Sequence, residues 1–160
     1  MKCLSLWQPW ASLIAIGAKT LETRSWETMY RGELAIHAAQ KWTRELGQIA
    51  ASEPFVSALT EAGLDQTWIK KLCANSSPTA KKMIPLGAIL CTAKLVDCYR
   101  IDPLTAPLDA RELAFGDYTT GRFAWVLEDV RPLANPIPFK GRQGLFNVPA
   151  SLLKVMEARP

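Results

Sequence analysis

The sequence predicts an α+β fold, with strands in both halves of the chain and a helical segment between them. Residues 33–38, 87–100 and 122–130 alternate apolar with polar side chains, which is the period-two pattern of β-strands. From Trp42 to about Asn75 the apolar side chains recur at helical spacing instead, within an insertion over about residues 43–86. Prolines and glycines separate these segments, which indicates turns between them.

The length and composition of the chain fit an ordinary globular protein. Its 160 residues suit a single domain over residues 1–160 with a proper core, and 49% of them are apolar. The N-terminus lacks the regions of a signal peptide, and no apolar run approaches the roughly 18–20 residues that cross a bilayer. We therefore expect a cytoplasmic protein with no membrane partner, and the sequence leaves its oligomeric state open.

The formal charge of +4 is unevenly distributed. Residues 1–44 and 122–160 each carry +3, whereas residues 87–121 carry −2. A basic surface is compatible with a polyanionic partner, although a charge this small is also ordinary for solubility.

Cysteine and histidine are too scattered to predict a metal site. Cys3, Cys73, Cys91 and Cys98 lie in apolar segments without a CxxC pair, so we interpret them as reduced core residues. With one histidine in the chain, structural zinc is not expected either. The sequence predicts no metal and no cofactor.

The stretch from residue 4 to residue 39 has the most informative turns. Pro9 suits the first turn of a helix, and Trp10, Leu13 and Ile14 follow at helical spacing. Gly17 tolerates the positive φ that commonly ends a helix. The helix is therefore expected to end before Lys19, which lies on the turn into the next strand.

That strand is expected to gather charges on one face. Alternation places Glu22, Arg24 and Trp26 on the face opposite Thr23, close to Lys19. A charged functional site is one interpretation. The alternative is a surface salt bridge between Glu22 and Arg24 or Lys19, worth about 0–1 kcal/mol.

His37 lies on the following strand, opposite a core face made by Leu34, Ile36 and Ala38. A single strand histidine is more often a structural hydrogen-bonding group than a catalytic base. Because it is the only histidine, a mechanism with two histidines is excluded. Any acid–base pair would have to draw on Lys, Glu, Asp, Tyr or water.

The helical segment is expected to contain three helices that pack beside the strands. Thr43 is a plausible N-cap of the first, Phe55 begins the second, and the third carries Trp68, Ile69 and Leu72. We interpret the segment as an insertion rather than a second domain. Its surface is also a possible platform for a protein partner.

The second half of the chain supplies the remaining strands and a basic loop. Prolines exclude residues 132–138 from a central strand, so we expect an extended edge that crosses an open end of the sheet. Lys140 and Arg142 lie in a glycine-flanked loop that brings backbone N–H groups and two cations close to a phosphate. A short helix is expected over residues 108–115, a final strand over 145–148 and a closing helix after Pro149.

The ordered motifs of the chain resemble those of one family. The runs LSLWQPWASLI, GAKTLETRSW and YRGELAIHAA, with GDY, GRFAW and PIP to GLF later, resemble the ASCH domain (activating signal cointegrator homology). The resemblance covers most of the chain outside residues 43–86. It implies a PUA-like small mixed β-barrel with flanking helices and an α-helical insertion.

The same resemblance implies a ligand groove between the first helix with its turn and the strands opposite. Such a groove has cations for phosphate, aromatic rings for bases and a carboxylate for selection, as single-stranded or splayed RNA requires. We therefore expect a module that binds RNA or another nucleic acid, or a modified nucleoside. Trp10 and Trp125 are assigned to the core, and Trp7 and Trp26 are left open. Besides Lys140 and Arg142, the expected groove residues are Trp7, Gln8, Lys19, Glu22, Arg24, Trp26, Tyr30, Arg31 and His37.

A hydrolase is the alternative that the resemblance implies. One branch of the family removes the acetyl group from acetylated cytidine with a lysine at the GxK position, a threonine three residues later and a glutamate elsewhere. Lys19 matches the lysine, but Glu22 occupies the threonine position and would act as a general base for water beside Lys19. A ribonuclease with Lys19 and Arg24 on the phosphate, and Glu22 or Asp117 on a metal-bound water, lacks a cluster of carboxylates.

Overall fold

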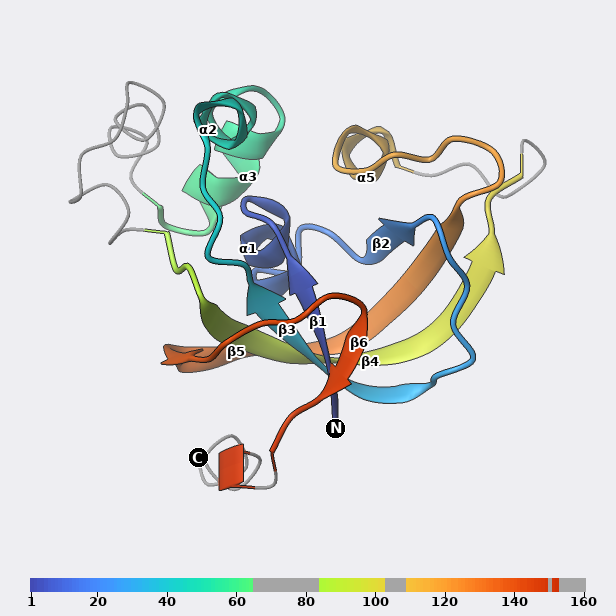
Figure 1. The fold of residues 1–160 in the computed structure, drawn as a ribbon. Helices are drawn as coiled ribbons and strands as arrows, with labels where there is room; N and C mark the ends of the chain where they lie inside the picture. Colours follow the sequence, from blue (N-terminus) through green and yellow to red (C-terminus); the bar gives the residue numbers. More distant parts are fainter. Residues whose placement is uncertain (65–83, 103–108, 150, 153–160) are drawn as a thin grey trace.

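One curled sheet organises the protein (Figure 1). The computed structural model describes residues 1–64, 84–102, 109–149 and 151–152. Six strands follow the order β2-β5-β4-β3-β1-β6, and only the β1–β3 pair is parallel. This mixed half-barrel with helices confirms the predicted α+β, PUA-like fold class. The strands are β1 (Lys2–Leu6), β2 (Leu21–Arg24), β3 (Gly32–Ala38), β4 (Ala88–Arg100), β5 (Phe123–Pro138) and β6 (Leu145–Asn147).

The helices lie on one side of the long β4 and β5 strands in Figure 1. Helix α1 packs on β3, β4 and β5, and α2 packs on α3. None of the described helices is both long and apolar enough to span a lipid bilayer. The described helices are α1 (Trp10–Ala15), α2 (Arg44–Ala51), α3 (Phe55–Glu61) and α5 (Ala110–Ala114).

The main core lies between α1 and the sheet. Leu4 and Leu6 of β1 join Leu34 and Ile36 of β3 there, and all four are buried. Burying such a side chain contributes about 1.5–3 kcal/mol, so α1 is held mainly by its apolar face. The other face of the sheet carries a smaller apolar cluster around Cys3.

Helix α1 is fixed at its start by a side chain that the sequence did not assign to this task and at its end by the glycine that it did. The Gln8 amide accepts a hydrogen bond from the Ser12 N–H (3.0 Å) and donates one to the Pro85 carbonyl (2.9 Å). Gln8 is fully buried, so the structure gives it a capping role. Gly17 ends the helix with φ +75°, as its position after the apolar stripe predicted.

The helical segment begins as expected. The Thr43 hydroxyl accepts a hydrogen bond from the Leu46 N–H and caps α2, and Phe55 begins α3. Phe55 and Leu59 then pack with Leu13 of α1 in a second apolar cluster. The expected third helix lies outside the described residues, as does most of the closing helix after Pro149.

The proline-rich stretch continues β5 instead of crossing an open end of the sheet. Pro132 pairs with Cys91 and Pro138 pairs with Ala88, whereas β2 pairs only with the beginning of β5. The prolines therefore have a neighbouring strand on one side only. Their missing N–H groups are tolerated there, which explains why the edge position was predicted correctly and the crossing was not.

Candidate functional site

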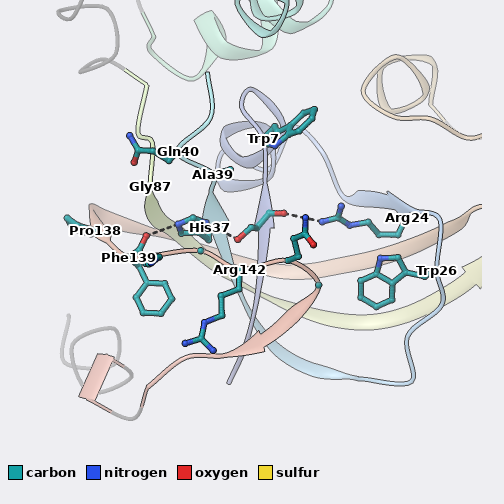
Figure 2. A pocket seen from close by; sticks show the side chains of 15 residues that line it. Trp7, Arg24, Trp26, His37, Ala39, Gln40, Gly87, Pro138, Phe139 and Arg142 are labelled. Atoms are coloured by element: carbon teal, nitrogen blue, oxygen red, sulfur yellow. Dashed lines mark hydrogen bonds between the residues drawn. The ribbon is translucent and has the colours of Figure 1, made fainter. Parts of the chain in front are cut away.

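A cleft of about 840 Å³ lies where β1 and β3 meet the loop after β5. In Figure 2 Trp7 lies above His37, Arg142 lies below it, and Arg24 and Trp26 lie to one side. Its described lining contains three permanent cations and no carboxylate. The lining residues are Ser5, Trp7, Arg24, Trp26, His37, Ala39, Gln40, Gly87, Pro138, Phe139, Lys140, Gly141, Arg142, Gln143 and Gly144.

His37 joins the sheet to the basic loop. Its Nε2 lies 2.9 Å from the Phe139 carbonyl, which can only accept, so Nε2 carries the proton. In the neutral ring Nδ1 then accepts a hydrogen bond from the Ser5 hydroxyl, 3.0 Å away (dashed lines in Figure 2). Burial lowers the pKa of His37 below its usual value, which favours this neutral form.

Phe139 anchors the start of the basic loop. Its N–H donates to the Gly87 carbonyl (2.9 Å), and its ring stacks on Phe146 with the two planes 4° apart. Gly141 then passes so close to the sheet that a Cβ there would collide with the His37 ring and would lie 2.6 Å from Ser5 Oγ. Only glycine permits this approach.

The loop presents unused hydrogen-bond donors. The backbone N–H groups of Gly141 and Arg142 have no hydrogen-bond partner among the described residues. Adjacent free N–H groups form an anion-binding concavity when a turn exposes them together. The side chains of Lys140 and Arg142 add two positive charges at the same place.

Two tryptophans at the cleft are exposed, which is unusual for side chains of this size. Trp7 is 50% exposed, and Lys41 Nζ lies 4.5 Å from its ring centroid. Trp26 is 37% exposed and packs against Trp125 in a T-shaped arrangement, with 4.7 Å between the ring centroids. Trp125 itself is fully buried, which confirms its assignment to the core; Trp10 is half-buried against Phe55.

Arg24 is incompletely paired. Its Nη2 donates to the Ser5 carbonyl (3.2 Å), and Nε lies 3.5 Å from Glu22 Oε1. That second contact is an ion pair without hydrogen-bond geometry, and the buried Nε has no hydrogen-bond partner among the described residues. The Arg24 side chain is 26% exposed, so part of its charge faces the cleft.

Lys19 lies elsewhere, inside an internal ion pair. It is fully buried, with Nζ 3.1 Å from Glu112 Oε1. The second Glu112 oxygen accepts from the Thr20 N–H (2.8 Å), and the Tyr118 hydroxyl donates to Oε1 (2.8 Å). Burial and the Glu112 carboxylate raise the pKa of Tyr118. No spacing in the sequence signals this partner, because Glu112 lies 93 residues from Lys19.

Glu22 lines a second, smaller pocket of about 340 Å³ together with Asp117. Burial raises the pKa of Glu22, against the lowering effect of the Arg24 and Lys19 charges. Hydrogen bonds from the Thr119 hydroxyl and N–H lower the pKa of Asp117. The two carboxyl groups of this pocket are therefore pushed toward different protonation states.

The structure divides the expected groove residues between several places. Tyr30 donates to the Glu33 carbonyl, and Arg31 pairs with Asp97 at 3.2 Å, so neither lines the cleft. Lys19 and Glu22 belong to the cluster and the pocket above, and Gln8 caps α1. The cleft brings together Trp7, Arg24, Trp26, His37, Lys140 and Arg142.

Sequence reasoning missed the neutral polar residues of the cleft. Ser5, Gln40 and Gln143 all line it. Ser5 becomes visible only from strand pairing, because the parallel register places it directly opposite His37. Among the described residues, no three His, Cys, Asp or Glu side chains come together as a metal site requires.

Comparisons with known proteins identify the family and the fold. The ASCH-domain profile matches residues 4–137. The human protein "Activating signal cointegrator 1" is 56% identical over 96 residues, which are 60% of this chain and 14% of that protein. Its mouse counterpart is 56% identical over 39 residues, 24% of this chain and 7% of that protein. The chain therefore matches a small part of each of these relatives.

Solved structures show the same fold at low sequence identity. The crystal structure of ASCH from Zymomonas mobilis matches with a TM-score of 0.53 and 17% identity, covering 98% of this chain and 93% of that one. A single-residue variant of the same protein matches with a TM-score of 0.52 and 17% identity, covering 98% and 96%.

Proposed function

The chain belongs to the ASCH-domain family, and we propose that it binds single-stranded RNA in the cleft between β1, β3 and the basic loop. ASCH domains have a PUA-like fold that is generally linked to RNA binding. To this general link we add the binding site on the protein, the kind of RNA (an unpaired strand) and the residues that make the contacts.

One observation carries the proposal: the described lining combines three cations and two exposed tryptophans with no carboxylate. Several described cations outside the cleft are instead paired with a carboxylate, as Lys19 is with Glu112 and Arg111 is with Glu61. Unbalanced cations attract an anion, and the tryptophan rings select one that carries flat bases. RNA has both features.

The arrangement favours an unpaired strand. A base stacked on an aromatic ring contributes about 1–3 kcal/mol, but only a splayed base exposes its face. Trp7 has Lys41 over its ring, and a cation on one face leaves the other for stacking. The phosphate between two such bases would meet Lys140, Arg142 and the free N–H groups of the loop.

Binding is tested by fluorescence anisotropy with a labelled single-stranded RNA at several salt concentrations. The double variant Lys140→Ala/Arg142→Ala should bind at least ten times more weakly. The plot of log K against log salt should also become shallower by about 1.4 in slope, because each of the two lost phosphate contacts contributes about −0.7.

The matched control removes one lysine and one arginine outside the cleft. Lys94 and Arg131 are both exposed, on β4 and β5. Lys94→Ala/Arg131→Ala should change affinity less than twofold. An equal loss in the two double variants would show nonspecific attraction to a basic protein and would contradict the cleft as the site.

A second candidate function, hydrolysis of RNA or of an acylated nucleoside at the smaller pocket, is favoured by the opposite pKa shifts of Glu22 and Asp117. Such a divergence is typical of acid–base pairs. Lys19 would supply a nearby positive charge. Product from a panel of acylated nucleosides and RNAs should disappear in Glu22→Gln, while RNA binding in the cleft stays unchanged. Turnover that survives Glu22→Gln would exclude this role for Glu22.

A further inference from the structure

A serine hydroxyl and a histidine ring face each other in the floor of the cleft. Ser5 of β1 and His37 of β3 are direct partners in the parallel register, so their side chains emerge on the same face of the sheet. Ser5 Oγ lies 3.0 Å from His37 Nδ1. A nucleophile within hydrogen-bond reach of a base is the first requirement of acyl transfer.

The second requirement is a group that orients the base. The Phe139 carbonyl accepts from His37 Nε2–H at 2.9 Å, which leaves the Nδ1 lone pair directed at Ser5. Phe139 is itself fixed by its N–H bond to Gly87 and its stacking on Phe146. The described charged groups in the lining of the cleft are Arg24, Lys140 and Arg142, and all three are positive.

The third requirement is a set of donors for the oxyanion. The loop backbone passes Ser5 so closely that a Cβ on Gly141 would lie 2.6 Å from Oγ. The N–H groups of Gly141 and Arg142 are unpartnered among the described residues. Preorganised backbone N–H groups are a usual way to stabilise a tetrahedral oxyanion, and these two belong to the loop that contacts Ser5.

We propose that Ser5 and His37 form a nucleophile–base pair that hydrolyses carboxylic esters of phosphorylated molecules, with acylated nucleotides as the substrate class. The ester follows from the Ser–His chemistry. The phosphate and the base follow from the cations and tryptophans of the cleft, and this part rests on the proposed function.

The reaction is balanced within the protein and water. Ser5 Oγ attacks the ester carbonyl carbon, and its proton moves to His37 Nδ1. Collapse of the tetrahedral intermediate breaks the ester C–O bond, and the leaving alcohol oxygen takes that proton. Water then attacks the acyl–Ser5 carbonyl, gives its proton to His37 Nδ1 and forms the carboxylic acid, and Ser5 Oγ recovers the proton as it leaves.

The nucleophile is tested with a fluorophosphonate probe on the full chain, followed by peptide mass spectrometry. The probe forms a bond from Ser Oγ to phosphorus and releases fluoride. Labelling is expected on Ser5, absent in Ser5→Ala, and at least 100-fold slower in His37→Gln, which keeps a donor for Phe139 but no base. Ser57→Ala, at a half-buried serine on α3, is the matched control and should label like the parent.

The substrate class is tested by hydrolysis of 3′-O-acetyl adenosine 5′-monophosphate against p-nitrophenyl acetate. Lys140→Ala/Arg142→Ala should raise KM for the nucleotide ester at least ten times more than it raises KM for the neutral ester, whereas the control Lys94→Ala/Arg131→Ala, outside the cleft lining, should change neither. RNA binding is measured on the same samples. Labelling of Ser5 no faster than of Ser57, with RNA binding intact, overturns the esterase and leaves the proposed function standing. Ester hydrolysis that depends on Ser5, in a protein that does not bind RNA, would overturn the proposed function and leave the esterase standing.

Discussion

Two regions of the molecule place cations from neighbouring parts of the sequence in opposite environments, one buried and the other open to the cleft. Lys19 ends the turn after α1 and is fully buried against Glu112. Arg24 ends the next strand, β2, and keeps an unsatisfied Nε beside the open cleft. Both are cations with a carboxylate nearby, but Lys19 is fully enclosed, whereas the Arg24 side chain is 26% exposed and its hydrogen bonds are incomplete. The difference teaches that a candidate binding surface is better located by exposed, incompletely bonded charge than by charge alone.

The buried region stabilises the fold through complete pairing. A buried lysine costs free energy unless its charge is paired and hydrogen-bonded. Glu112 supplies that partner and also accepts from Thr20 and Tyr118. The cleft lacks any such carboxylate in its described lining. The positive charge of that lining is therefore not neutralised within it, which is the premise of the proposed binding site.

The largest expected effect comes from removing the carboxylate that pairs with the buried Lys19. Glu112→Ala leaves the Lys19 charge buried and unpaired, which should lower the free energy of unfolding by about 3–5 kcal/mol. Lys19→Met/Glu112→Leu should recover most of this loss, because it removes both charges. Urea denaturation measures both variants, with the exposed Glu61→Ala as control. A loss below about 1 kcal/mol for Glu112→Ala would show that the pair is not needed for folding.

The next effect acts on the cleft. Trp7→Ala should weaken single-stranded RNA binding by about 1–3 kcal/mol, since one stacking surface is lost, and Trp7→Phe should retain part of it. Stability should hardly change, because Trp7 is half exposed. Anisotropy titrations measure the affinity, and Met29→Ala, at another exposed apolar side chain, is the control. Equal affinities for the two alanine variants would remove Trp7 from the interface.

The smallest expected effect concerns Glu22, which interacts electrostatically with both Arg24 and Lys19. Burial raises the pKa of its carboxyl group. A carboxyl group with a raised pKa in the folded state binds its proton more tightly there than in the unfolded chain. The protein therefore loses stability as pH rises above the ordinary pKa of glutamate.

Glu22→Gln removes this dependence, so its stability relative to the parent should increase from pH 4.5 upward, by at most about 1.4 kcal/mol per pH unit. Thermal denaturation across that range measures it. A stability difference that stays flat with pH would mean that Glu22 ionises normally in the folded protein.

Local patterns were enough to predict most of the fold. Alternation identified the strands around Leu34 and Ile89, and Gly17 ended α1 where its position after the apolar stripe predicted. Alternation depends only on which face of a strand meets the core, so neighbouring residues carry the information. The unbroken course of β5 was missed, because proline is excluded from a strand only where both sides are paired.

The sequence predicted which types of residue the candidate site contains, but less well which individual residues reach it. Trp7, Arg24, His37 and the Lys140–Arg142 loop reach the cleft, but Lys19 and Gln8 are buried in other networks. Nothing near Lys19 in the sequence reveals Glu112, and nothing near His37 reveals Ser5. These pairings exist only because distant segments meet in the folded sheet.

The sequence by itself determined the strands, the helix ends and the supply of cations and aromatic rings, because each depends on near neighbours along the chain. Tertiary structure decided which of those cations found a carboxylate and which stayed unpaired. The physical reason is that an ion pair acts over a few ångströms in space and is indifferent to separation along the chain. Burial then made one charge part of the core, and exposure left the others to a ligand.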